Sequence, residues 1–171
     1  MNMARHFPML LLLTLGFSAL AGPARAQNSG AEGHGEIAVV VNTMNPLSDL
    51  ALPELRKMLT GERRFWKGNV QVRLVLRAPG SPEHDRVIAL LLHMDNASFA
   101  ELWRAKVFRG EAADEPPKVA SGNLAAEYVG RTSGGITFMA ARSVPPGLKI
   151  LSVDGKLPGQ PGYALNKDSR Q

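Results

Sequence analysis

The sequence has no cysteine among its 171 residues, and only 6% of its residues are aromatic. Without cysteine the chain has no disulfide, no thiolate nucleophile, no thiolate metal site and no lipid-modified cysteine. After the first 26 residues no apolar run reaches the roughly 20 residues that a membrane-spanning helix needs. The lysines and arginines are scattered rather than gathered in a stripe with aromatics, which excludes an ordinary nucleic-acid-binding surface. The sequence therefore indicates a domain that folds on its own hydrophobic core, without membrane insertion.

The amino terminus has the three parts of a secretory signal peptide. Arg5 supplies a positive charge, the stretch from Phe7 to Ala21 is mostly Leu and Ala, and Ala24-Arg25-Ala26 is an A-x-A cleavage site. We predict a signal peptide over residues 1–26 and an exported protein. An exported chain without disulfides suits a bacterial periplasm, and without cysteine it is not a lipoprotein.

Composition divides the rest of the chain into three parts. Residues 27–36 are rich in Gly, Ser and Asn and read as a flexible leader, and residues 37–155 read as one domain. Residues 156–171 contain repeated Pro and Gly, so we expect a loose C-terminal tail. The formal net charge of +5 gives only a mild bias toward anionic ligands.

Hydrophobic periodicity and helix start and stop signals predict the element order β, α, β, α, α, α, β, β. The predicted strands are 37–41, 70–77, 136–140 and 148–153. The predicted helices are 52–59, one from Pro82, one capped by Asn96 or Ser98, and 121–130. The continuous run of 37–41 is typical of a central strand buried on both faces. This order predicts an α/β fold, a single open mixed sheet flanked by helices.

Several apolar side chains are expected in the core of this domain. Phe65 and Trp66 should hold their loop against it, and Met44 and Met58 should fill gaps within it. Leu124 should face inward from its helix.

One strand–turn–helix stretch contains most of the candidate ligand-binding residues of the chain. Arg77 ends a strand, Gly80 lies in the turn, and Ser81 is placed to cap the helix that follows. Helix N-terminal amides, here those around His84, commonly hold an oxyanion. We predict that Arg77 supplies a charge-assisted contact, Ser81 a hydroxyl and the helix end its amides.

Two further side chains follow the predicted central strand. Asn42 and Thr43 lie at its carboxyl end, where open α/β sheets place ligands, so they are expected to line the same crevice.

A simpler alternative needs no ligand. Ser81 then only caps its helix, and Arg77 pairs on the surface with Glu83 or Asp85. Catalysis and metal binding have less support. His84 and His93 fall on different faces of one helix, and PGSPE does not match the nucleophile motif G-x-S-x-G. No catalytic residue, metal site or cofactor is predicted.

The stretch VVVNTMNPLSDLALPELRKMLTGERRFWKGNVQVRLVLRAPGSP, with WRAKVFRG and TSGGITFM further on, resembles the periplasmic phosphate-binding proteins of ABC transporters. The resemblance implies one lobe of a type 2 periplasmic binding protein, whereas the full family has two lobes. Arg77, Gly80 and Ser81 match the family's phosphate turn. Pro79 replaces its Asp, Pro82 its Gly and Glu83 its Thr.

The leading hypothesis is an exported solute-binding-protein-like domain, not an enzyme, that binds phosphate or another small oxyanion weakly. An ABC permease or another periplasmic protein is the partner that the resemblance implies. The alternative is a periplasmic protein-interaction module that has lost ligand binding.

Overall fold

The computed structural model describes residues 36–166, and these form strands and helices in alternation. The strands are β1 (Ile37–Asn42), β2 (Asp49–Leu50), β3 (Arg73–Leu74), β4 (Leu76–Arg77), β5 (Lys118–Val119), β6 (Gly135–Ala140) and β7 (Leu148–Val153). The helices are α1 (Leu52–Leu59), α2 (Pro82–Leu92), α3 (Asn96–Phe108), α4 (Gly122–Arg131) and the short 3-10 helix η1 (Ala141–Ser143). All of the predicted helices and the predicted central and last strands are present.

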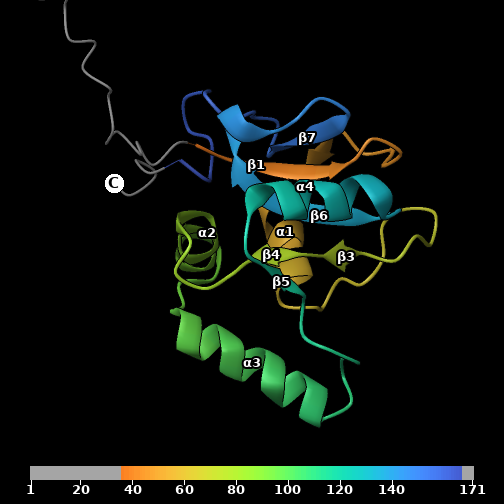
Figure 1. Ribbon diagram of the computed structural model, residues 1–171, viewed down its shortest axis with the longest axis vertical. Coiled ribbons are helices and arrows are strands. Elements are labelled where there is room, and N and C mark those ends of the chain that lie inside the picture. Colours follow the sequence, from red (N-terminus) through yellow and green to blue (C-terminus); the bar gives the residue numbers. More distant parts are fainter. Residues whose placement is uncertain (1–35, 167–171) are drawn as a thin grey trace, which may run out of the picture. The chain divides into compact units, whose positions relative to one another are not determined.

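One five-stranded sheet has the order β2-β7-β1-β6-β3 (Figure 1). Its central strand β1 runs antiparallel to both neighbours, and Val39 lies opposite Phe138 on β6 and Leu151 on β7. The outer pairs β2–β7 and β3–β6 are parallel. The sheet is therefore mixed and the domain is α/β, as predicted.

The alternation of side chains along β1 places a core on each face of the sheet. Ile37, Val39 and Val41 belong to the larger core, which also contains the apolar side chains of α1 and α2. Ala38 and Val40 point the other way, toward α4. Figure 1 shows α1 and α4 on opposite sides of the sheet. Both faces are covered, which is why β1 is apolar from Ile37 to Val41.

The predicted strand 70–77 is broken into pieces. Gln71 forms an isolated bridge with Phe65, β3 pairs with β6, and β4 pairs with β5 in a separate two-stranded sheet. The strand changes partners around Val75, whose N–H still donates to Ile136 at 3.0 Å. The two-residue β5 follows a proline pair in a polar loop and gave no strand pattern of its own. The prediction of one continuous strand is wrong because its partners are short and come from distant segments.

The segment after β7 belongs to the core. Tyr163 and Leu165 are completely buried, and the Tyr163 hydroxyl donates to the Ile37 carbonyl at 2.9 Å. The prediction of a loose tail is therefore wrong for residues 156–166. Repeated Gly and Pro indicate turns, but they do not reveal that apolar residues between the turns pack on the sheet.

Three predictions of single core residues are also wrong. Leu124 is 48% exposed, and Ala126 takes its inward position on α4. Met44 and Phe65 are exposed, whereas Trp66 is buried and its indole N–H donates to the Gly134 carbonyl at 2.9 Å. Met58 is buried as expected.

The start of α3 also differs from the prediction by a small shift. Asp95, rather than Asn96 or Ser98, is the N-cap, and its carboxylate accepts from the Ser98 N–H at 2.7 Å. A carboxylate cap is also favourable to the helix dipole.

The predicted signal peptide and nearly all of the predicted leader lie outside the described residues, as do residues 167–171. Within 36–166, no helix is both long enough and apolar enough to cross a membrane.

Candidate anion-binding crevice

The candidate site lies where the carboxyl ends of three strands meet. Because β4 is parallel to β5, and β3, which leads into β4, is parallel to β6, strands β4, β5 and β6 end at the same edge. Ligands of open α/β sheets bind at that edge. A crevice of about 240 Å³ is present there, lined by Arg77, Glu83, Ser121, Gly122, Asn123, Phe138, Met139, Ala140 and Ser143.

Arg77 supplies the positive charge of this crevice. One terminal nitrogen donates to the Ala120 carbonyl at 3.2 Å, and the other lies 3.6 Å from the Glu83 carboxylate. Its Nε atom is buried and has no hydrogen-bond partner among residues 36–166. A Cβ built on Gly122 would lie 3.6 Å from the Arg77 Nη1 atom, so the guanidinium group lies beside the first turn of α4.

The N-terminus of α4 adds backbone donors. Ser121 is the N-cap, and its hydroxyl oxygen accepts from the Leu124 N–H at 3.2 Å. The N–H groups of Gly122 and Asn123 have no acceptor within the helix, as expected for a first turn, and none in the described part of the chain. Together with the helix dipole, these groups make the region beside Arg77 favourable for an anion.

The predicted backbone donors around α2 are already used within the protein. The Ser81 hydroxyl oxygen accepts from the His84 N–H at 3.4 Å, and the Gly80 N–H donates to the Asp85 carboxylate at 3.0 Å. Pro82 has no N–H. Within this first turn the N–H of Glu83 is the backbone donor left for a ligand. The ion pair expected from the simpler alternative, Arg77 with Glu83, is present. Anion contacts from the Gly80 and His84 amides would require their hydrogen bonds to break, whereas the Ser81 hydroxyl can still donate its own hydrogen.

The His84 side chain has a packing role. It is 2% exposed, its ring meets Phe99 edge-on at 6.0 Å, and Nδ1 lies 3.2 Å from the Asp85 carboxylate. Burial would by itself raise the pKa of Asp85, but hydrogen bonds from Asn96, Gly80 and His84 outweigh it and the pKa lies below its ordinary value. Asp85 thus ties the turn before α2 to the start of α3.

Asn42 and Thr43 do not reach this crevice. The Asn42 side-chain amide donates to the carbonyls of Val129 and Gly130, both at 2.9 Å, so it caps the C-terminal end of α4. A ten-residue helix is about 15 Å long, and the crevice lies at its other end. Thr43 is exposed beside Asn42. The expectation that the two residues line the same crevice as Arg77 is wrong, because β1 is antiparallel to β6 and ends at the opposite edge.

Sequence reasoning missed the contribution of Ser121, Gly122 and Asn123. The helix they begin was predicted, and a Ser-Gly start is a usable signal for exposed amides. What could not be read from the sequence is that β5 lies beside β4, which brings this helix start to Arg77. Among residues 36–166, no cluster of His, Asp or Glu could hold a metal ion.

No protein-family model matches the chain, and no curated protein matches it in sequence. Solved structures do match it. An ABC-type phosphate transport receptor from Vibrio cholerae superposes with a TM-score of 0.61 at 18% identity, over 76% of this chain and 52% of the receptor. PstS from Borrelia burgdorferi gives 0.60 at 20% identity, over 76% of this chain and 53% of PstS.

A putative phosphate ABC transporter substrate-binding protein from Clostridium perfringens, solved with bound phosphate, gives a TM-score of 0.58 at 20% identity. That match covers 72% of this chain and 46% of the other. The chain thus spans about half the length of these binding proteins, which confirms the predicted similarity to one lobe. At these identities the likeness establishes the fold and leaves the ligand open.

Proposed function

We propose that this chain is an exported binding domain that holds a small oxyanion, phosphate first among the candidates, in the crevice beside Arg77. The observation that carries the proposal is the position of the Arg77 guanidinium group, between the N-termini of two helices and within a crevice of about 240 Å³. A fixed positive charge beside first-turn amides is a common way to hold an oxyanion. The fold shared with phosphate-binding proteins supports the same assignment.

In this arrangement the anion would contact Arg77 and the N–H groups of Gly122 and Asn123. The Ser143 side chain lines the same crevice and offers a hydroxyl. Glu83 also lines the crevice, 3.6 Å from Arg77, and its carboxylate competes with the ligand for the guanidinium group. We therefore expect weak binding, with a dissociation constant in the millimolar range.

Thermal unfolding with phosphate, sulfate and acetate tests this proposal. For a dissociation constant of about 1 mM, a ligand at about 10 mM stabilises the folded state by about 1.4 kcal/mol. The R77Q variant should lose this response, and the E83Q variant should show a larger one because it removes the competing charge. R104Q is a matched control, since Arg104 pairs with Glu101 at 2.8 Å on the exposed side of α3. No stabilisation by any of the three anions, or an equal response in R77Q, would refute the proposal.

Export follows from the predicted signal peptide and has its own test. The protein recovered from the periplasm should begin at Gln27, which mass spectrometry of the intact chain would measure. An uncleaved chain, or one found in the cytoplasm, would contradict export without affecting the proposal about the anion.

A second candidate function is a periplasmic interaction module. The Phe108 side chain, at the end of α3, is 93% exposed, and Arg109 follows it. Arg109 is paired with Glu111 at 2.5 Å, so the exposed aromatic ring itself is the feature typical of a protein contact. Purification of the tagged protein from the periplasm should then recover an ABC permease or another partner, and the F108S variant should lose it. If the wild type and the F108S variant recover the same proteins, this function is contradicted.

A further inference from the structure

A second cavity, of about 340 Å³, lies along the outer edge of β3 and shares no lining residue with the crevice beside Arg77. Its walls come from the residues after α1, from β3, from Trp103 on α3, from the loop before β5, and from Tyr128 on α4. We propose that this cavity binds a small organic carboxylate with an apolar body, of the kind represented by an N-acylated amino acid.

The cavity exists because the edge of the strand is open at a single residue. The N–H groups of Arg73 and Val75 donate to Gly134 and Ile136 of the sheet, both at 3.0 Å. Alternation along a strand then directs the N–H and C=O groups of Leu74 away from the sheet.

The neighbouring outward positions already have partners. The Val72 N–H donates to the Arg64 carbonyl at 2.8 Å, and the Leu76 N–H donates to the Pro117 carbonyl at 3.0 Å. Between them, Leu74 has no backbone partner among residues 36–166. The opening admits one amide group but not an added strand, because both ends of the edge are closed.

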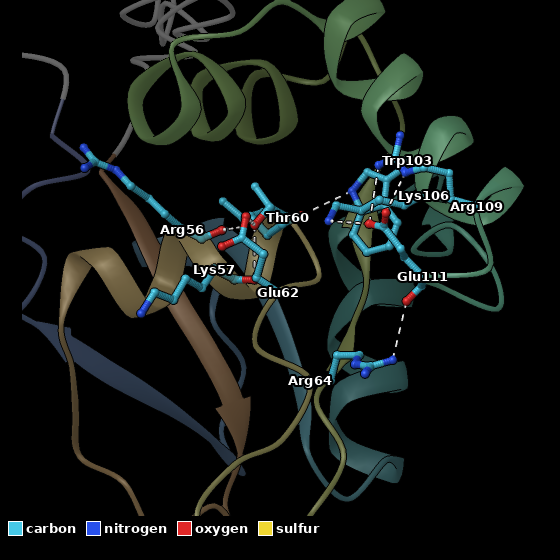
Figure 2. A network of polar contacts seen from close by, with 10 residues as sticks. Arg56, Lys57, Thr60, Glu62, Arg64, Trp103, Lys106, Arg109 and Glu111 are labelled. Carbon is cyan, nitrogen blue, oxygen red and sulfur yellow. Dashed lines mark hydrogen bonds and ion pairs between the residues drawn. The ribbon is translucent and has the colours of Figure 1, made fainter.

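Two arginines give the cavity its charge. Arg73 has no carboxylate partner in the described part of the chain, and Arg64 donates only to the Glu111 carbonyl, at 3.4 Å (Figure 2). Arg63 lies nearby but is paired with Glu54 at 2.6 Å. Two guanidinium groups that lack carboxylate partners and line one cavity favour a bound carboxylate.

Two carboxylates lie on the other lip of the cavity. Glu115 is paired with Lys118 at 2.6 Å, and Asp114 is exposed. The cavity lining contains three arginines and these two acids, so its net charge is positive.

The opposite wall is apolar and fixed. Trp103 is 7% exposed, and its indole N–H donates to the Leu59 carbonyl at 3.2 Å, which holds the ring in place. The ring lies against Gly61, where even a Cβ atom would come within 2.7 Å of it. Met58 and Val72 complete this wall. An inorganic anion would leave the wall unfilled, whereas an aliphatic side chain would cover it.

These walls define the ligand class. The carboxylate lies between Arg64 and Arg73, an amide carbonyl accepts from the Leu74 N–H, and the apolar group lies on Trp103. The volume is at the lower end of the range for small-molecule sites, which is roughly 300–1,000 Å³.

Fluorescence of Trp103 provides a direct test. The chain has two tryptophans, so the W66F variant leaves Trp103 as the only one. Titration with N-acetyl-L-leucine should give a saturable change in its emission. Heat measured on titrating the wild-type protein with the same probe provides a second readout, which does not depend on W66F folding well.

N-acetyl-L-leucinamide, which lacks the carboxylate, should bind about tenfold more weakly. R73Q and R64Q should each weaken binding of the acid by a similar factor, while R104Q should leave it unchanged. Equal binding of acid and amide, unchanged binding in both R73Q and R64Q, or no saturable signal in either readout would overturn the proposal. An equal change in Trp103 emission with inorganic phosphate would overturn the requirement for an apolar body, whereas phosphate heat that is lost in R77Q belongs to the crevice beside Arg77. Since R77Q tests the other crevice, failure at one site is distinguishable from failure at the other.

Discussion

Replacing Tyr163 by phenylalanine measures how far the segment after β7 stabilises the domain. The ring is completely buried, and its hydroxyl donates to the Ile37 carbonyl at 2.9 Å. Phenylalanine keeps the packing and removes the donor, which leaves a buried carbonyl without this partner. Such a loss costs about 1–3 kcal/mol. With a urea m value of about 1–3 kcal/mol/M, the midpoint of unfolding should fall by about 1 M at pH 7.

The same substitution changes the response to alkaline pH. Burial raises the pKa of Tyr163 well above its ordinary value. In the unfolded chain the phenol ionises near pH 10, so its contribution to stability is complete below about pH 10 and is lost as the pH rises further. The loss is about 1.4 kcal/mol at one pH unit above that value. The advantage of the wild type over Y163F should therefore shrink by about 1.4 kcal/mol between neutral pH and pH 11.

Urea unfolding followed by tryptophan fluorescence at pH 7, 9, 10 and 11 is the assay. The Y128F variant is the matched control, because Tyr128 is the other tyrosine of the chain and is only half-buried. A Y163F midpoint equal to that of the wild type at pH 7 would refute the buried hydrogen bond. A constant difference from pH 7 to pH 11 would refute the argument from ionisation.

Three further predictions concern backbone and capping. G134A should lower the free energy of unfolding by about 2 kcal/mol or more beyond the effect of G80A, because a Cβ on Gly134 would clash with the Gln71 carbonyl whereas Gly80 faces open space. Equal losses of stability in thermal unfolding would contradict this. D85N should lower the free energy of unfolding by about 1 kcal/mol at pH 7, since the carboxylate is partly exposed. In urea titrations this loss should vanish as the pH falls through the lowered pKa of Asp85. A loss that persists at pH 2 would show that the carboxylate charge is not what stabilises the domain. N42A should destabilise the domain by about 1–3 kcal/mol yet keep the phosphate response, and loss of that response would place Asn42 at the crevice after all.

Local sequence signals predicted an element correctly wherever that element depends on neighbouring residues and its burial agrees with its sequence pattern. The helix at Pro82 begins where Ser81 and Pro82 predicted, because its cap is made by neighbouring residues. The run at Ile37–Val41 predicted a central strand, because being buried on both faces requires apolar residues at every position. Arg77 ends its strand, as the sequence predicted.

The rest of the candidate site depends on contacts between residues that are distant in the sequence. The Gly80 and His84 amides are adjacent to Arg77 in sequence, yet Asp85 and Ser81 already accept from them. The donors beside Arg77 come instead from Gly122, which has no sequence pattern linking it to the strand.

The sequence by itself determined the four helices, the cap at Ser81, the buried central strand and the charge at Arg77, because each depends on residues within a turn or two of one another. Only the tertiary structure decided which helix end meets Arg77, since that depends on β5 pairing with β4 across a long loop. It also decided that the last described residues pack on β1, and that one open position remains at Leu74. Pairing of distant strand edges leaves little trace in composition or periodicity, because the pairing uses backbone groups that every residue has.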